Sequence, residues 1–243
     1  MTNIARITHA IHGIDREIRA VRREIEAFER FHERVRPLSI ASPSSEPTID
    51  SDTSRVVDIY HETVTGTDDF DDAYGESRRE HMANEFGAGL ASRLGRADHL
   101  TGELKREILA SAERSVSSRG RFIDVLDAER ASLLDARETL EEIIDQLERL
   151  PVCTVRDSAL ETVVDAWETF ERLTNDCERL AQQRQRFLIE RRNRRFEHAD
   201  ATELDAYLYG DLDTIHPVLR TITETVSSIE YKKTSDDRPT VTA

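Results

Sequence analysis

Cysteine is nearly absent from this 243-residue sequence, which contains only Cys153 and Cys177. Two cysteines cannot build a disulfide framework, and on their own they cannot complete a zinc site. Cys177 lies on an apolar helical stripe, so we expect it to be a small core residue. The scarcity of cysteine therefore excludes a fold that depends on a disulfide framework.

Long apolar runs are also missing from the sequence. No stretch approaches the roughly 20 apolar residues that a helix needs to span a bilayer. The amino terminus has no charged segment followed by an apolar run, so it does not resemble a secretory signal. We therefore expect a soluble, cytoplasmic protein that does not contact a membrane.

Lysine is scarce as well. Only three of the 34 basic residues are lysines (Lys105, Lys232 and Lys233), and the other 31 are arginines. With 49 acidic residues, the net charge is −15. An acidic, lysine-poor surface is typical of proteins adapted to molar salt, where counterions screen the self-repulsion of the chain. We expect a salt-adapted protein whose fold loosens when salt is removed. An ordinary acidic cytosolic protein is the alternative.

A heptad stripe near the start of the sequence predicts one long helix over residues 2–36. Its apolar side chains recur at alternating spacings of three and four: Ile4, Ile7, Ile11, Ile14, Ile18, Val21, Ile25 and Phe28. Such a stripe must be buried against other helices, and isoleucine at both heptad positions favours more than two helices at the seam. We expect helix 2–36 either to pack along the rest of the chain or to self-associate with a partner chain.

Two further heptad stripes predict a long antiparallel helical hairpin over residues 98–197. The first stripe is Phe122, Leu126, Glu129, Leu133, Ala136, Leu140, Ile143, Leu147 and Leu150, and the second is Leu160, Val163, Trp167, Phe170, Thr174, Cys177, Ala181, Arg184 and Leu188. Pro151 ends the first helix, and Ser158 with Glu161 forms a capping box for the second. The turn 151–157 is short enough to make the two helices antiparallel neighbours.

The other segments of the chain are shorter than the hairpin. Beyond the helical segment 1–36, residues 37–54 contain three prolines and many serines, which is typical of a linker. Residues 55–97 predict short, broken helices around an acidic turn. Residues 198–243 predict short helices followed by a polar tail.

These patterns together predict an all-α protein, an elongated antiparallel helical bundle with coiled-coil-like long helices. Four short segments, AFERF (27–31), YHETV (60–64), YGES (74–77) and NEFG (84–87), also resemble an uncharacterised family of haloarchaeal helical coiled-coil proteins with a domain of unknown function. The resemblance implies an all-helical, salt-adapted protein. It implies no activity, cofactor or catalytic residue.

Arginine is concentrated near the end of the second hairpin helix. Residues 184–195 hold six arginines with one acid, Glu190: Arg184, Arg186, Arg191, Arg192, Arg194 and Arg195. Such a cluster can contact the phosphates of nucleic acid, while Phe187 and Phe196 stack on bases. The negative charge of the whole protein opposes that interpretation, because long-range steering would be repulsive. Pairing with acids on a neighbouring helix and contact with a protein partner are the other interpretations.

The sequence contains only weak candidates for metal or phosphate sites. Glu29 and His32 have the Glu-x-x-His spacing of a di-iron site, but the sequence has no second copy. The acidic residues in 68–76 depart from the calcium-loop spacing. Gly87 and Gly89 follow no strand and precede no Gly-Lys-Ser/Thr, so we expect them to break helices. We predict no metal, no cofactor and no catalytic residue.

The sequence therefore favours interaction over catalysis. Sustained heptad seams without a catalytic constellation predict a non-enzymatic coiled-coil scaffold or protein-interaction protein of a salt-adapted cytoplasm. Its expected partner is another protein, or a second copy through helix 2–36. The alternative is a nucleic-acid-associated regulator that uses the arginines of 184–195. A small-molecule sensor with a pocket near Tyr60 and Tyr74 is a third class.

Overall fold

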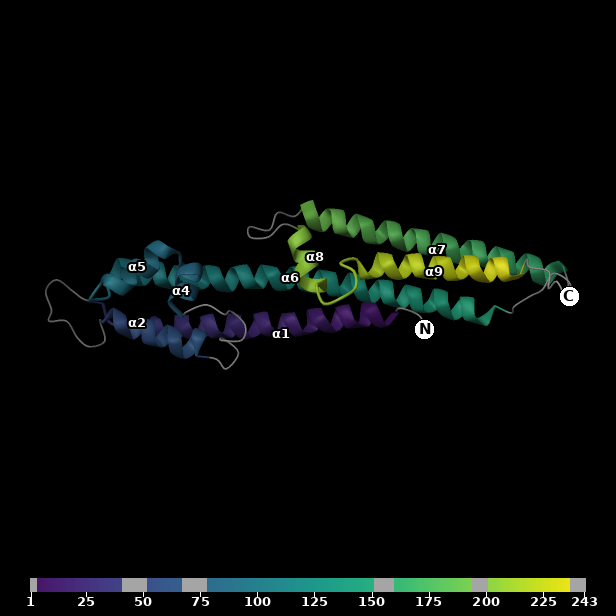
Figure 1. Cartoon of the computed structure of the whole chain (residues 1–243). Coiled ribbons are helices and arrows are strands. Elements are labelled where there is room, and N and C mark those ends of the chain that lie inside the picture. The colour runs from purple at the N-terminus through teal and green to yellow at the C-terminus, as the bar shows by residue number, and fades with distance from the viewer. Residues whose placement is uncertain (1–3, 41–51, 67–77, 151–159, 194–200, 237–243) are drawn as a thin grey trace. The chain divides into compact units, whose positions relative to one another are not determined.

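The structure is a computed structural model that describes residues 4–40, 52–66, 78–150, 160–193 and 201–236. Within these ranges the chain forms eight α-helices and one short π-helical segment, and it has no β-strand (Figure 1). The prediction of an all-α protein built from long helices that pack against each other is confirmed.

The chain divides into two compact units. Met1–Arg16 and Leu126–Ala243 form the first, which we call the terminal unit, and Glu17–Val125 forms the second, the middle unit. Helices α1 (Ile4–Val35) and α6 (Gly102–Arg149) each contribute residues to both units. The boundaries of the units therefore fall inside the expected segments 1–36 and 98–197 and not between segments.

The terminal unit contains the last part of α6 together with α7 (Leu160–Asn193), α8 (Ala201–Tyr209) and α9 (Pro217–Asp236). Helices α6 and α7 are antiparallel, because hydrogen bonds join Arg184 to Ser132 (2.8 Å) and Arg172 to Gln146 (2.8 Å). Helix α9 lies side by side with α7 (Figure 1). This arrangement is the antiparallel pairing that the two heptad stripes predict.

The buried stripe of α7 differs from the predicted one on one side. Phe170, Cys177 and Arg184 are buried in agreement with the predicted stripe, but Ala166, Leu173 and Leu180 replace Trp167, Thr174 and Ala181 beside them. Both flanks fit a heptad spacing, and the chain buries the flank that carries the two leucines. Trp167 is 37% exposed, and the Lys233 ammonium lies 3.9 Å from the centroid of its ring.

The middle unit contains the later part of α1, α2 (Thr53–Tyr60), the π-helical segment η2 (His61–Thr65), α4 (Arg78–Phe86), α5 (Ala88–Arg96) and the first part of α6. Aromatic rings form the centre of its core. The Tyr60 ring lies edge-on to Phe31 at 5.4 Å and to Phe86 at 5.3 Å between centroids. Edge-to-face pairs of this kind add to the energy of apolar burial.

Helix α1 buries most of its predicted stripe within the single chain. Six of the eight side chains are at most 5% exposed: Ile7, Ile11, Ile14, Ile18, Val21 and Phe28. Ile4 and Ile25 are partly exposed. Because this face is already covered, self-association through the stripe of helix 2–36 would have to displace packing that the chain makes with itself.

Ion pairs fix α1 against α6 within each unit. In the middle unit, Arg119 contacts Glu24 at 2.6 Å and His32 lies 3.2 Å from Glu113, so the two helices run antiparallel. In the terminal unit, Arg130 of α6 contacts Asp15 of α1 at 2.6 Å. Arg6 of α1 also contacts Asp213 (2.8 Å) and Glu224 (3.1 Å), which connects α1 to the α9 region.

Several predicted features lie outside the described residues. They are most of the linker 37–54, the acidic residues of 68–76, the hairpin turn 151–157 and the tail beyond residue 236. Helix α9 continues to Asp236, so the start of the predicted polar tail is helical.

Candidate functional site

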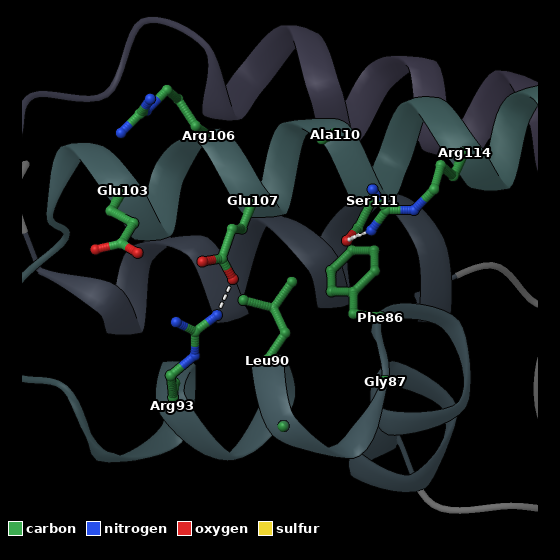
Figure 2. Close-up of a pocket in the computed structure, with 11 residues that line it drawn as sticks. Phe86, Gly87, Leu90, Arg93, Glu103, Arg106, Glu107, Ala110, Ser111 and Arg114 are labelled. Atoms are coloured by element: carbon green, nitrogen blue, oxygen red, sulfur yellow. Dashed lines mark hydrogen bonds and ion pairs between the residues drawn. The ribbon is translucent and has the colours of Figure 1, made fainter.

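A groove of about 780 Å³ lies in the middle unit between α5 and the first part of α6 (Figure 2). Phe86, the last residue of α4, also lines the groove. The remaining lining residues come from α5, from Gly87 just before it and from α6: Gly87, Gly89, Leu90, Arg93, Glu103, Arg106, Glu107, Ala110, Ser111 and Arg114. The groove therefore combines an apolar floor with a charged rim.

Small and apolar residues form the floor and keep the groove open. The Phe86 and Leu90 side chains point toward α6, and Ala110 on α6 presents only a methyl group (Figure 2). Gly87 has φ +84°, a conformation that favours glycine, and it separates α4 from α5 as predicted. Gly89 lies inside α5, so the prediction that it breaks a helix is wrong. Apart from its chain neighbours and the backbone of its own helix, no atom lies within 4 Å of the position that its Cβ would take.

The arginines on the rim differ in whether a carboxylate neutralises their charge. Arg93 of α5 forms an ion pair with Glu107 of α6 across the groove (Figure 2). The Arg114 guanidinium donates to Ser111 Oγ at 2.7 Å, and Arg106 Nε donates to the Gly102 carbonyl at 3.2 Å. Among the described residues, neither Arg106 nor Arg114 forms an ion pair with a carboxylate. Two exposed cations therefore border the groove on a protein with a net charge of −15.

A smaller hollow of about 340 Å³ continues this basic surface. It shares Arg93 and Glu103 with the groove, and it adds Arg96 at the end of α5. Arg96 is exposed, and it has no ion pair with a carboxylate within the described part of the chain. The basic surface around the groove thus extends past the end of α5.

A buried ionic centre occupies the terminal unit. Glu129 of α6 has a fully buried side chain that accepts hydrogen bonds from Arg184, Arg191 and Tyr209. The Arg191–Glu129 contact is 2.5 Å, and Arg191 also pairs with Asp205 of α8. Two cations and two carboxylates balance each other, so the centre joins α6, α7 and α8 without leaving a net buried charge.

Electrostatics keep these buried groups in defined protonation states. Burial opposes ionisation of Glu129, but the charges of Arg184 and Arg191 outweigh it and lower the pKa of the carboxyl group. Burial, reinforced by the charge of Glu129, raises the pKa of Tyr209 well above its ordinary value. At neutral pH the carboxylate is therefore ionised, and the phenol keeps the proton that it donates.

This centre corrects the predicted arginine patch of residues 184–195. Arg184 is 4% exposed and Arg191 is 5% exposed, so neither can contact a surface partner. Arg186 and Arg192 are exposed, and Arg186 Nε donates to the Gln182 carbonyl at 3.3 Å. Arg194 and Arg195 lie outside the described residues. Pairing with acids of neighbouring helices accounts for the two buried arginines.

A second ionic network stabilises the middle unit. Arg119 pairs with Glu85 of α4 and Glu24 of α1, both at 2.6 Å, and its guanidinium lies 4.7 Å from the centroid of the Phe28 ring. Ser115 donates to Glu85 at 2.8 Å. Burial opposes ionisation of Glu85, but the hydrogen bonds and charge of Arg119 lower the pKa of this carboxyl group. Arg119 thus connects α1, α4 and α6.

The structure also shows where several of the other candidate site residues lie. His32 of the Glu29–His32 pair contacts Glu113 on α6, and Glu29 is exposed. Tyr60, which we considered as a pocket residue, is fully buried in the core and shares a 2.7 Å hydrogen bond with His81 Nδ1. Tyr74 lies outside the described residues. Where the structure is described, no three histidine, cysteine or acidic side chains gather to hold a metal.

Two further predictions concern membranes and cysteine. In the ranges that the structure describes, no helix is both long and apolar enough to cross a bilayer. Cys177 is buried, as predicted, and burial raises the pKa of its thiol to about 11. The thiol therefore remains protonated at neutral pH, which suits a packing role better than a nucleophilic one.

Sequence reasoning missed the groove and the pairing at the buried centre for different reasons. Glu129 and Arg184 both occupy apolar positions in the two heptad stripes of the predicted hairpin. Because these stripes face each other and the two charges are opposite, the sequence contained a signal for the buried pair. The groove depends on how α5 packs on α6, and no local spacing relates Arg93 to Arg106 or Arg114. It could therefore be found only from the folded structure.

Comparisons with known proteins give one family. A family model described as "Domain of unknown function (DUF7260)" matches residues 5–233, which is most of the chain. This match confirms the resemblance to a family with a domain of unknown function. Neither the search of curated proteins nor the search of solved structures gives a match.

Proposed function

We propose that this chain, which belongs to the DUF7260 family, is a non-enzymatic protein-interaction protein that presents the α5–α6 groove to a partner protein. One observation carries the proposal. Arg106 and Arg114 border the groove, and Arg96 borders the adjoining hollow, as exposed cations; within the described residues none has a carboxylate partner. Arginine at an exposed surface next to buried apolar residues is a typical composition of protein interfaces.

The contrast with the interior arginines supports this proposal. Arg119, Arg184 and Arg191 are held by carboxylates of neighbouring helices, where they serve the packing of the protein itself. Within the described part of the chain, Arg106 and Arg114 make hydrogen bonds only inside their own helix, so they can bind an external carboxylate, whereas Arg93 pairs with Glu107. We infer that these two populations of arginine have different roles.

We also propose that the protein works in a salt-rich cytoplasm, such as that of haloarchaea. The support is compositional: 49 acidic residues, 31 arginines and three lysines with a net charge of −15. At molar salt the Debye length is about 3 Å, so repulsion between surface carboxylates is almost fully screened.

We expect the fold to loosen when KCl is lowered from about 1 M to about 10 mM, because the screening length then grows roughly tenfold. Far-ultraviolet circular dichroism would record this as a loss of helical signal. Sucrose at matched osmolality is the control, since it favours compact states without screening charge, and it should restore less of the signal than KCl does. A helical signal that is the same at both KCl concentrations would contradict the proposal.

The function itself is tested by purifying the tagged full-length protein from its cells in molar KCl, with and without nuclease. We expect a stoichiometric protein that stays bound after nuclease treatment. Material that nuclease releases would instead favour the nucleic-acid alternative through residues 184–195, and it would contradict the proposal. Arg184 and Arg191 are buried, so they are not available for that alternative.

A further inference from the structure

We propose that the α5–α6 groove binds an acidic amphipathic helix of a partner protein. This inference rests on the proposed function and specifies the chemistry of the partner. Helix-in-groove recognition places the apolar stripe of one helix into a hydrophobic channel, and side chains at the rim fix its position. The groove offers both elements, as Phe86 and Leu90 form the floor and Arg106 and Arg114 lie at the rim (Figure 2).

The spacing of the rim arginines suits a helix that lies along α6. Arg106 and Arg114 are eight residues apart on one helix, which corresponds to about 12 Å along its axis. Carboxylates about two helical turns apart on a docked helix have the same separation. Each guanidinium can then bind one carboxylate through two parallel hydrogen bonds.

The floor accounts for the amphipathic character of the partner. Phe86 and Leu90 are at least nine-tenths buried, and Ala110, which also lines the groove, is small enough to leave room for a bulky side chain from outside. An incoming leucine or phenylalanine would cover the remaining exposed edges of these residues and lose its own contact with water. This apolar contribution persists in molar salt, where long-range attraction between charges does not.

The carboxylates of the groove argue against nucleic acid as the occupant. Glu103 and Glu107 lie on the same wall of α6 as the arginines, so a continuous phosphate backbone would contact both signs of charge. A helix can avoid this conflict because its charged positions are discrete. Its basic or amide side chains can face the two glutamates while its acidic ones face Arg106 and Arg114.

The test is a binding titration of the full-length protein with defined peptides at constant molar KCl. The probe is a fluorescein-labelled synthetic helix with leucines at heptad a and d positions and glutamates on the flanking positions. The control peptide keeps the leucines and replaces every glutamate with arginine. Fluorescence anisotropy measures both, and a labelled single-stranded oligonucleotide is titrated in parallel.

Three variants locate the binding surface. Arg106→Glu with Arg114→Glu reverses the rim, and Arg22→Glu with Arg36→Glu makes the same change in net charge at two exposed positions outside the groove. Ala110→Trp fills the groove without changing any charge. Circular dichroism of each variant shows whether its helices are intact, and the Ala110→Trp variant keeps the test valid if the charge reversal perturbs folding.

We expect the acidic peptide to bind the natural protein roughly tenfold or more tightly than the basic peptide. Reversal of the rim and filling of the groove should each weaken that binding by about tenfold or more, while the Arg22/Arg36 control stays within about twofold. Equal binding of both peptides, unchanged binding to the rim variant, or binding of the oligonucleotide alone would each overturn the inference. If a nuclease-resistant protein partner is still recovered from cells in that case, the role as a protein-interaction protein survives, and the binding of an acidic helix at the groove is wrong.

Discussion

Replacing Glu129 with glutamine is expected to lower the free energy of unfolding by about 3–5 kcal/mol, because it leaves Arg184 and Arg191 as buried cations without their shared carboxylate. The side chain of Glu129 is 0% exposed, and those of its two arginine partners are 3% and 5% exposed, so water cannot replace the lost charge. Urea denaturation at constant KCl measures the change as a shift in the midpoint with an unchanged slope.

Glu142→Gln is the matched control for this substitution. Glu142 is exposed on the same helix, so its replacement should change stability by at most about 0.5 kcal/mol. A second check uses Arg184→Met, which should cost less stability in the Glu129→Gln background than in the natural protein, since the two side chains are coupled. Equal effects of Glu129→Gln and Glu142→Gln would show that the buried ionic centre does not contribute as described.

The same substitution predicts a change in the acid sensitivity of the protein. The pKa of Glu129 in the folded state lies below its ordinary value of 4.5. Its contribution to stability is therefore fully present above pH 4.5 and is lost as the pH falls through the lowered value. Because glutamine cannot titrate, the stabilities of the natural protein and the Glu129→Gln variant should converge in acid. The pKa of Glu85 is lowered in the same direction, so some acid sensitivity remains in the variant.

Truncation of Phe31 to alanine should destabilise the middle unit by about 3–5 kcal/mol. Phe31 is fully buried, and its ring contacts Tyr60 at 5.4 Å and Phe86 at 5.6 Å between centroids. The substitution removes a large apolar side chain and leaves a cavity among rings that cannot all move to fill it. Urea denaturation gives the magnitude, and amide hydrogen exchange shows whether protection falls in α2 and α4.

Tyr231→Ala is the control for the loss of an aromatic ring. Tyr231 is 76% exposed, so removal of its ring should change stability by no more than about 0.5 kcal/mol. If Phe31→Ala and Tyr231→Ala had the same effect, the aromatic cluster could not be the centre of the core of the middle unit.

Much of the fold follows from periodicity, and the exceptions have clear physical causes. All side chains of the stripe from Ile7 to Phe28 except Ile25 are buried, because a long run of apolar heptads has only one face to cover. In α7, however, Trp167 and Leu173 lie on opposite flanks of the same stripe, and sequence spacing fits either flank. The position of a neighbouring helix decides which flank is buried, and that information is tertiary.

The candidate site was less accessible to sequence reasoning than the fold. The arginines of residues 184–195 fitted pairing with neighbouring helices, a protein contact or a nucleic-acid contact, because charge density along a helix does not distinguish exposed cations from paired ones. Arg184 and Arg191 are buried because Glu129 and Asp205 face them from other helices. Arg106 and Arg114 belong to no cluster or motif in the sequence, but in the structure they border a groove with an apolar floor.

One comparison tests the groove as the partner surface most directly: parallel purification of three tagged proteins from cells in molar KCl after nuclease treatment. They are the natural protein, the Arg106→Glu/Arg114→Glu variant and the Arg22→Glu/Arg36→Glu control. We predict that the natural protein and the control retain the same stoichiometric partner, and that the groove variant loses it while keeping its helical content. Retention of that partner by the groove variant at the same stoichiometry would contradict the proposed role of the groove.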